Sequence, residues 1–375
     1  MKFVAEKNVL LKALSHGQSI VEKKHTMPIL SNIKIEAFKN EDGDFIRLVS
    51  TNTEIEIVEI IPAVISEIGV TTASADKLYS IVNKLENGSQ VEFVSNDGEA
   101  KLNIKSGKSI FHIPTIPADT FYIMENADLT TNFKISPINL KMLIDNTSFA
   151  VAKDTTTHLS LGGVYLHEIN QNDGAMLRAV ATDGHRMACQ DIPLPSGAEG
   201  MNGVIIPKKA LDKLDELLNG QIDDIDVSLS STSIVFNFKN LKFSANLVDG
   251  KYPDYLRVIP SNNDKVMEIN SQVFGDAIDR ISVMADKNNV LKVKICKNMI
   301  EISSNSSEGG SSEEPVDAIY VGDTMEIGFN FRYLSEILKK IPGIVKISFS
   351  ENSKPVLLQG QDVKDSLYVL MPMRV

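Results

Sequence analysis

The chain has 375 residues, of which 43% are hydrophobic, and its formal net charge is −11. This length predicts two to three domains, each with enough apolar residues for its own core. Its two cysteines, Cys189 and Cys296, lie far apart in apolar contexts, which argues against a disulfide framework or a thiolate metal site. No segment resembles a signal peptide or reaches the roughly 20 apolar residues of a membrane span, so we expect a cytoplasmic protein.

The first third of the chain predicts two helices separated by short strands. Apolar residues at helical spacing indicate a helix over 8–25, and a second helix over 74–88 ends at Gly88, a residue suited to a left-handed cap. Alternating apolar residues predict strands over 29–37, 45–50, 53–61, 91–94, 101–104 and 109–113. The segment 116–119 is the first linker.

The remaining two thirds repeat this order. Helices are predicted over 136–153 and 207–220, each with a proline at its start, and then over 270–287 and 330–341. Strands over 227–229, 234–238 and 242–247 precede a second linker at 248–253. The Ser- and Gly-rich stretch 303–314 is expected to be a solvated loop between two strands.

Corresponding features return after roughly 120 to 135 residues, about one domain length. The pattern predicts an α+β fold of three structurally similar domains in tandem (1–125, 126–262 and 263–375). Each has two helices packed on an antiparallel sheet. The exposed sheet edges of such domains can pair with one another, and a head-to-tail contact between copies then closes a ring or grows a filament.

Charge is unevenly distributed along the chain. The six predicted helices hold 15 Lys and Arg against 11 Asp and Glu, whereas the remainder holds 23 against 38. One interpretation is chance together with helix-favouring lysines on solvated faces. The other is a basic surface that faces a polyanion, with the acidic surface facing outward.

Asp183, His185 and Arg186 lie within four residues and could suggest catalysis. A hydrolase would also need a nucleophile that the histidine positions, yet there is no GxSxG elbow, phosphate-binding loop or paired-histidine metal motif. A tight hairpin turn at Asp183-Gly184 is the favoured interpretation. The segment 369–373 predicts a core strand with a frayed end, although a Met-rich surface can also form a groove for peptides.

Six segments together carry a family resemblance: 1–3, 28–32, 179–186, 247–255, 325–330 and 369–375. In their order and spacing they resemble the bacterial sliding clamps, the beta subunits of the replicative DNA polymerase. The strings ATDGHR and MPMR are specific to that family, and the segments span the whole chain.

The resemblance implies a non-enzymatic processivity factor without cofactor or metal. Two three-domain protomers would form a head-to-tail homodimer, a closed ring around double-stranded DNA that attracts phosphates without reading sequence. The residues implied to face DNA are Lys24, Lys77, Lys153, Lys208 and Lys209; helix position adds Lys213, Lys339 and Lys340. Lys24 and Lys77 stand where relatives often have Arg, which keeps the charge and loses the bidentate fork.

The resemblance also implies a pocket between the second and third domains for short linear peptides of DNA polymerase, clamp-loader and repair proteins. Peptides rich in Leu and Phe would suit such an apolar cleft with a few polar anchors. Its implied residues are Leu161, Thr182, Gly184, His185, Arg186, Met187, Pro253, Arg257, Val258, Asn330, Tyr333, Ser353, Pro355, Val369, Met371, Pro372, Met373 and Arg374. Met187 replaces the usual Leu, the tail ends in Val375 instead of Leu, and no pocket residue is taken from 287–292.

For ring closure, the resemblance places the last strand of the first domain against the third domain of the partner. The residues implied are Lys108, Ile110, Phe111, Ile113, Val283, Met284, Glu308, Glu313 and Glu314. An apolar centre flanked by opposite charges suits such an interface.

Two other classes of function stay open at this point. An enzyme that uses Asp183 and His185 would lose its turnover when His185 is replaced by Ala. A passive structural oligomer would be indifferent to replacement of Lys24, Lys208 and Lys209 by Glu.

Overall fold

The structure is a computed structural model. It describes residues 1–22, 27–96, 98–125, 128–156, 158–171, 174–285, 288–306, 309–363 and 365–374. Lys24, Glu308 and Val375, which were named above, lie outside these residues.

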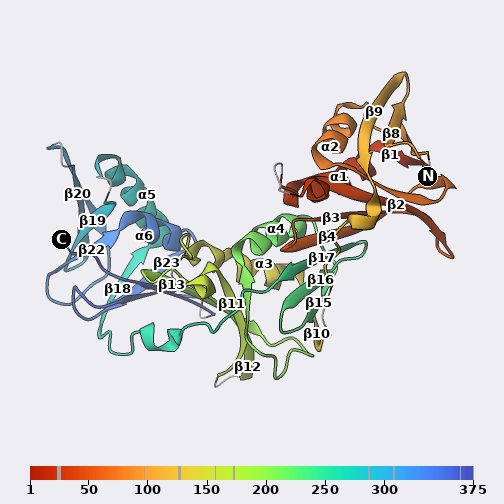
Figure 1. The fold of residues 1–375 in the computed structure, drawn as a ribbon. Helices are drawn as coiled ribbons and strands as arrows, with labels where there is room; N and C mark the ends of the chain where they lie inside the picture. Colours follow the sequence, from red (N-terminus) through yellow and green to blue (C-terminus); the bar gives the residue numbers. More distant parts are fainter. Residues whose placement is uncertain are drawn as a thin grey trace. The chain divides into compact units, whose positions relative to one another are not determined.

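One order of elements occurs three times along the chain, which confirms the predicted repeat (Figure 1). The first repeat comprises β1 (Lys2–Glu6), α1 (Lys7–Ile20), β2 (Asn32–Asn40), β3 (Gly43–Thr51), β4 (Ile55–Pro62), β5 (Val64–Glu67), β6 (Gly69–Ser74), α2 (Ala75–Lys84), β7 (Gln90–Val94), β8 (Lys101–Ser106) and β9 (Ser109–Ile116). The second comprises β10 (Thr131–Ile135), α3 (Pro137–Asp145), β11 (Gly163–Gln171), β12 (Gly174–Thr182), β13 (Arg186–Pro193), β14 (Val204–Pro207), α4 (Lys208–Leu218), β15 (Ile225–Leu229), β16 (Ser233–Asn237) and β17 (Leu241–Asn246). The third comprises β18 (Lys265–Asn270), α5 (Ser271–Ile281), β19 (Val290–Cys296), β20 (Met299–Asn305), β21 (Ser311–Asp317), β22 (Met325–Asn330), α6 (Phe331–Leu338), β23 (Ile344–Phe349), β24 (Val356–Gly360) and β25 (Ser366–Leu370). Apart from β5, the three repeats match element for element.

All six predicted helices are present, but each ends earlier than predicted. The first was expected to reach residue 25, whereas α1 ends at Ile20 because Val21 has an extended backbone with φ −75° and ψ 131°. The strand expected over 29–37 begins at Asn32, because Pro28–Ser31 forms a 3-10 turn. Apolar periodicity continues past the point where the backbone changes, so it overestimates helix length.

The stretch 303–314 is not a long solvated loop, so that prediction is wrong. β20 continues to Asn305 and β21 starts at Ser311, with Ser303 opposite Glu313. Ile302 and Val316 are buried in this hairpin. The Ser and Glu composition gave no signal of a strand because polar residues also occupy the inward positions, where Ser304 is buried and Ser312 is half-buried.

The chain divides into two compact units, residues 1–137 with 212–247 and residues 138–211 with 248–375. In the first unit, α1 and α2 lie side by side (Figure 1) over a core in which Phe3 and Phe93 stack with centroids 4.8 Å apart. In the second, α5 and α6 pack together, and α5 buries Phe274, Ala277 and Ile278 at helical spacing.

Sheets continue from one repeat into the next. In the first unit, β17 pairs antiparallel with β4, with Phe243 opposite Ile57. In the second unit, β25 pairs antiparallel with β13, with Tyr368 opposite Ala188. The expectation that domain edges pair is therefore confirmed at both junctions, and the middle repeat divides between the units because each of its sheets joins a neighbour.

Glu56 on β4 is a buried carboxylate in the first unit. Its Oε2 accepts a hydrogen bond from the Met124 backbone N–H at 2.9 Å. Burial raises the pKa of Glu56, against the opposing effects of this hydrogen bond and of Lys242. Because the folded pKa exceeds the unfolded one, ionised Glu56 destabilises the fold at neutral pH, and this cost disappears as pH falls to the unfolded pKa.

We expect Glu56→Gln to raise the melting temperature at pH 7 by about 2 °C. The amide oxygen can still accept the Met124 N–H, but it carries no buried charge. Melting of both proteins at pH 7 and pH 4 checks this. Equal melting temperatures at pH 7, or a gain that grows at pH 4, would contradict the account.

Candidate functional site

The hairpin turn between β12 and β13 is held by its own side chains. Asp183 Oδ1 accepts the backbone N–H groups of His185 and Arg186, both at 3.0 Å. Gly184 has φ +84°, which a glycine adopts readily, and its N–H donates to Thr182 Oγ1 at 3.1 Å. The predicted tight turn is confirmed, and Asp183 is engaged in forming it.

The C-terminal segment lies against this turn. The Met371 N–H donates to the His185 carbonyl at 2.9 Å, and the Met373 N–H donates to the Gly328 carbonyl on β22 at 2.8 Å. Val369 is buried on β25, whereas Met371 is 37% exposed. The predicted core strand is therefore correct, but its end is not frayed, because Met371 and Met373 are hydrogen-bonded to the second and third repeats.

Helix α6 adds an aromatic side chain to the same surface. The Asn330 side chain caps this helix by accepting the N–H groups of Arg332 and Tyr333. The Tyr333 ring stacks on His185, with ring centroids 6.5 Å apart. We call the surface formed by residues 182–185, Tyr333 and residues 371–373 the hairpin–tail surface.

Arg186 lies beneath this surface and is 4% exposed. Its guanidinium donates to Asp183 Oδ2 at 3.1 Å, to Glu336 and to the Phe149 carbonyl at 2.6 Å. It also lies 4.3 Å from the centroid of the Tyr333 ring. The resemblance implied a ligand-binding role, but these contacts make Arg186 a structural tie between the hairpin and α6.

The turn at Ser353 and Pro355 reaches the same sheet edge. Val356 pairs with Leu370, and Leu370 pairs with Arg186, so these three residues lie in a row across β24, β25 and β13. Three segments therefore meet at this edge of the sheet: the turn before Val356, the tail after Leu370 and the hairpin before Arg186.

The remaining predicted residues divide into core and surface. Met187 and Val369 belong to a buried cluster with Tyr252 and Tyr255, and Leu161 packs partly buried against it. Pro253, Arg257 and Val258 are exposed on the linker that carries these tyrosines. Met187 and Val369 thus support the surface from below.

Several important residues were not predicted from sequence. Glu336 could have been found, because it follows Tyr333 by three residues and so shares its helix face. Phe149 and Tyr255 gave no comparable signal, since their role depends on contacts with distant segments.

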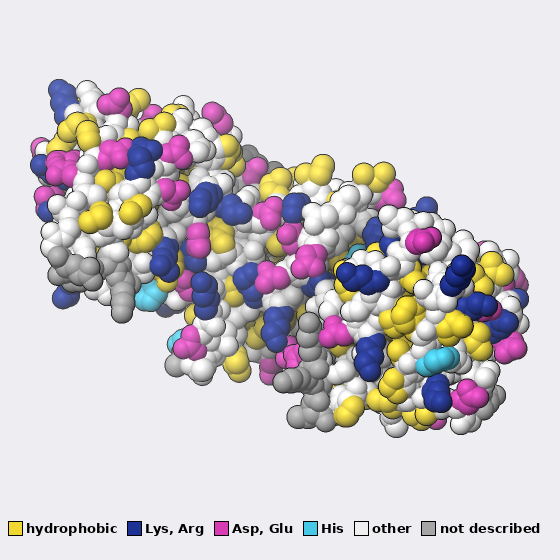
Figure 2. Space-filling model, turned by 90° about the horizontal axis from the view of Figure 1, so that it is seen from above, with side chains coloured by type: hydrophobic (Ala, Val, Ile, Leu, Met, Phe, Trp, Pro, Cys, Tyr) yellow, Lys and Arg dark blue, Asp and Glu magenta, His cyan; other side chains and the backbone are white. Residues whose placement is uncertain are grey.

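Most of the predicted DNA-facing lysines that the structure describes are accessible. Lys77 on α2, Lys153 and Lys209 are exposed, and Lys208 and Lys340 are half-buried. The prediction that Lys213 faces DNA is wrong. Lys213 is 7% exposed and pairs with Glu216, so its ammonium is not available to a phosphate. In the view of Figure 2, basic and acidic side chains are interspersed.

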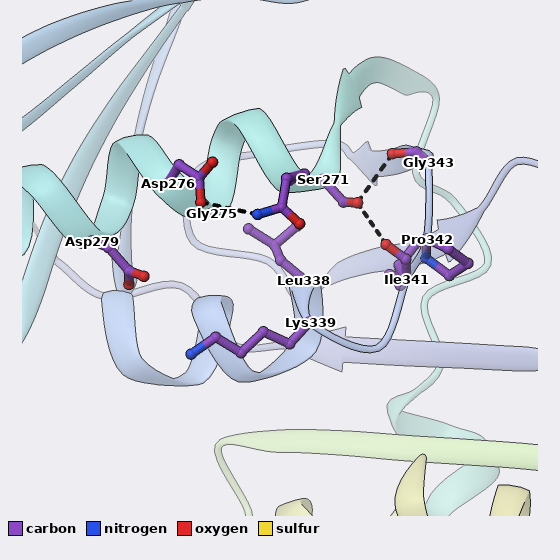
Figure 3. A pocket seen from close by; sticks show the side chains of 10 residues that line it. Ser271, Gly275, Asp276, Asp279, Leu338, Lys339, Ile341, Pro342 and Gly343 are labelled. Atoms are coloured by element: carbon purple, nitrogen blue, oxygen red, sulfur yellow. Dashed lines mark hydrogen bonds between the residues drawn. The ribbon is translucent and has the colours of Figure 1, made fainter.

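Lys339 is exposed at the rim of a groove between α5 and α6, of about 390 Å³ (Figure 3). Ser271 closes one end by donating to the Ile341 and Gly343 carbonyls at 2.6 and 3.0 Å. Asp276 and Asp279 line the same groove. Lys339 thus shares this groove with two carboxylates.

The residues predicted for the dimer interface differ in exposure. Ile110 is 59% and Val283 80% exposed, and Lys108 and Glu313 are also exposed. The prediction that Ile113 lies at the dimer interface is wrong, because Ile113 is 5% exposed and belongs to the first unit's core. Phe111 is half-buried and packs against that core, Met284 is 36% exposed, and Glu314 pairs with Arg280 at 2.5 Å.

The site offers no described nucleophile to His185. Burial raises the pKa of Cys189 to about 12, so its thiol stays protonated and unreactive at neutral pH. Within the described ranges, no three His, Cys, Asp or Glu side chains gather as metal ligands. No helix among the described residues is both long and apolar enough to cross a bilayer.

The chain has three similar repeats joined by continuous sheets, and aromatic, Met and Pro side chains form a surface at one junction. Together these features define the class of scaffold proteins that bind partners. Residues 1–125, 134–254 and 256–374 match the N-terminal, central and C-terminal domains of the DNA polymerase III beta subunit. The chain belongs to this family, the beta sliding clamps.

Relatives and solved structures agree along the whole chain. The beta sliding clamp of Caulobacter vibrioides is 36% identical and that of Escherichia coli 30% identical, with 100% of both chains covered in each case. A crystal structure of the Caulobacter crescentus clamp, 35% identical, superposes with a TM-score of 0.95 over all of both chains. A Bartonella birtlesii clamp bound to griselimycin has the same identity, coverage and TM-score. The predicted family and fold are confirmed.

Proposed function

We propose that two copies of the chain close head to tail into a ring around duplex DNA and act as a processivity clamp for a replicative polymerase. One pairing rule carries this proposal. At both junctions, the last strand of a repeat pairs with the third strand after the first helix of the preceding repeat, β17 with β4 and β25 with β13.

Two strands occupy the equivalent places without such a partner in the described chain. Residues 109–114 of β9 pair with β8 alone, and β21 pairs with β20 alone. In a head-to-tail dimer, β21 of each copy would pair with β9 of the other copy. Both open strand edges would then have a partner, and the ring would be closed. The charges support this contact, because Lys108 lies on the β8–β9 turn and Glu313 on β21.

The three domains correspond to residues 1–125, 126–262 and 263–375. The chain contributes no catalysis of its own and acts in the cytoplasm. Lys77, Lys153, Lys208 and Lys209, with Lys339 and Lys340, attract phosphates without reading bases. Lys24 belongs to this proposal on sequence alone.

The hairpin–tail surface receives short peptides of polymerase, clamp-loader and repair proteins. His185, Tyr333 and Met371 give it apolar contact area with polar edges, which suits Leu- and Phe-containing segments. Because Asp183 and Arg186 are engaged in structural contacts, this role fits the geometry better than acid–base catalysis.

Retention on DNA tests the proposal. We expect protein that a clamp loader has placed on nicked circles to stay bound, and to leave within minutes once a restriction enzyme linearises the DNA, because the link is topological. Equal retention on circles and linear molecules would overturn the proposal.

Equilibrium binding to open-ended duplex DNA over a salt series checks the lysines, because the topological link does not depend on them. Replacing Lys77, Lys153 and Lys209 together by Glu in both copies should weaken this binding and reduce its salt slope by about 6, one for each lost phosphate contact. The control replaces Lys239 and Lys297, exposed lysines in hairpin turns, and should leave the slope unchanged.

A further inference from the structure

The linker between the second and third domains carries exposed residues on a short 3-10 turn, Tyr255–Val258. Leu256 and Val258 are 57% and 43% exposed, whereas Tyr255 is 5% exposed. Arg257 is also exposed. Because one inward side chain anchors a turn of four residues, it decides where the outward side chains of Arg257 and Val258 lie.

The Tyr255 hydroxyl is bound on one side by His167 of β11. His167 Nδ1 lies 2.9 Å from the Glu168 backbone carbonyl, and Nε2 lies 3.0 Å from the Tyr255 hydroxyl. A carbonyl only accepts, so Nδ1 carries the ring proton and Nε2 accepts from the Tyr255 O–H. Burial lowers the pKa of His167, which keeps the ring neutral at pH 7.

A buried ion pair lies beside His167, because Arg178 is opposite His167 on β12 and Asp191 is opposite Arg178 on β13. Arg178 Nε and Nη2 donate to the two carboxylate oxygens of Asp191, both at 2.6 Å, and Gln171 donates to the same carboxylate at 2.6 Å. Burial raises the pKa of Tyr255, against the opposing effect of the nearby Arg178 guanidinium. The Tyr255 hydroxyl donates to His167 Nε2, and this bond orients it.

Tyr252, three residues earlier on the same linker, is held differently. Its ring stacks on Tyr165 with centroids 4.8 Å apart, and Tyr165 stacks on His167. Tyr252 is also 5% exposed, but its hydroxyl has no hydrogen-bond partner among the described residues. The linker thus has two equally buried tyrosines, of which one hydroxyl is oriented by the network and the other is not.

We propose that His167 is a positioning residue for partner-peptide binding. It acts through the Tyr255 hydroxyl, which orients the 255–258 turn and places Arg257 and Val258 beside the bound peptide. The inference rests on the proposed function, because it assigns these residues to the binding of an extended, Leu- and Phe-containing peptide.

The test uses the full chain and a fluorescein-labelled synthetic decapeptide that ends in leucine and phenylalanine. Tyr255→Phe removes only the oriented hydroxyl and should weaken peptide binding about tenfold, because the buried His167 Nε2 then lacks its hydrogen-bond donor. Tyr252→Phe is the matched control and should stay within about twofold of the wild type. His167→Leu should lose about tenfold, and His167→Gln should recover most of the affinity because its amide oxygen can accept from Tyr255.

Amide hydrogen exchange over 255–259 provides a readout that does not depend on peptide. Exchange should accelerate in Tyr255→Phe and His167→Leu but not in Tyr252→Phe or His167→Gln. Unchanged affinity and exchange in Tyr255→Phe would overturn the inference, as would failure of His167→Gln to recover. If the wild type does not bind the peptide while exchange follows the expected pattern, the proposed peptide site fails and the orienting network stands.

Discussion

Replacement of Arg186 by alanine is expected to lower the free energy of unfolding of the second unit by about 3 kcal/mol. The guanidinium is buried, and its loss leaves Asp183 and the Phe149 carbonyl without their donor while removing the cation–π contact with Tyr333. Peptide affinity should fall at least about 100-fold, because the Arg186 guanidinium no longer connects the hairpin to α6. Urea denaturation and peptide titration measure the two effects.

Arg257→Ala is the control for the charge itself. Its side chain is 86% exposed and, among the described residues, pairs with Asp254 alone, so the stability change should stay below about 0.5 kcal/mol. If Arg186→Ala were as stable as this control, the structural role assigned to Arg186 would be incorrect.

Replacement of Ile110 by aspartate is expected to convert the dimer to a monomer with a mass near 41.2 kDa. Ile110 is 59% exposed on β9 and makes little contribution to its own core, so the charge acts on the proposed contact with β21. Burying an unpaired carboxylate there should raise the dimer dissociation constant at least about 100-fold. Analytical ultracentrifugation over a concentration series measures this constant.

Ile222→Asp serves as the control, because Ile222 is 89% exposed and lies outside both open strands. It should remain dimeric. Phe111 is a less suitable position for this experiment, since its ring packs partly against the first unit's core and a charge there would also affect folding. A dimer that persists in Ile110→Asp would exclude β9 from the interface.

The registers at the two existing junctions predict that of the third. Phe243 is opposite Ile57 and Tyr368 is opposite Ala188. When the strand pairs β3–β4, β12–β13 and β20–β21 are aligned, Ser312 occupies the position equivalent to Ile57 and Ala188. Phe111 should therefore lie opposite Ser312 of the second copy, with Ile110 opposite Glu313.

The local chemistry of the sequence was sufficient for the repeat, the six helices and the turn at Asp183. Apolar spacing reports which helix face is buried, and an Asp-Gly pair forms its turn through hydrogen bonds within four residues. Because these sequence signals are local, they also explain why some predictions were wrong. Neither the end of α1 at Ile20 nor the strand pairing of Ser303 has a signal within its own segment.

The sequence by itself determined the family, the number of repeats and the residues of the hairpin and tail, because these depend on order and spacing along the chain. Only the tertiary structure decided that Lys213 and Ile113 face inward, that Arg186 ties two repeats together, and that the Tyr255 hydroxyl is oriented by His167. Each of these depends on which distant side chain supplies the second half of a contact, and a linear sequence does not contain that distance.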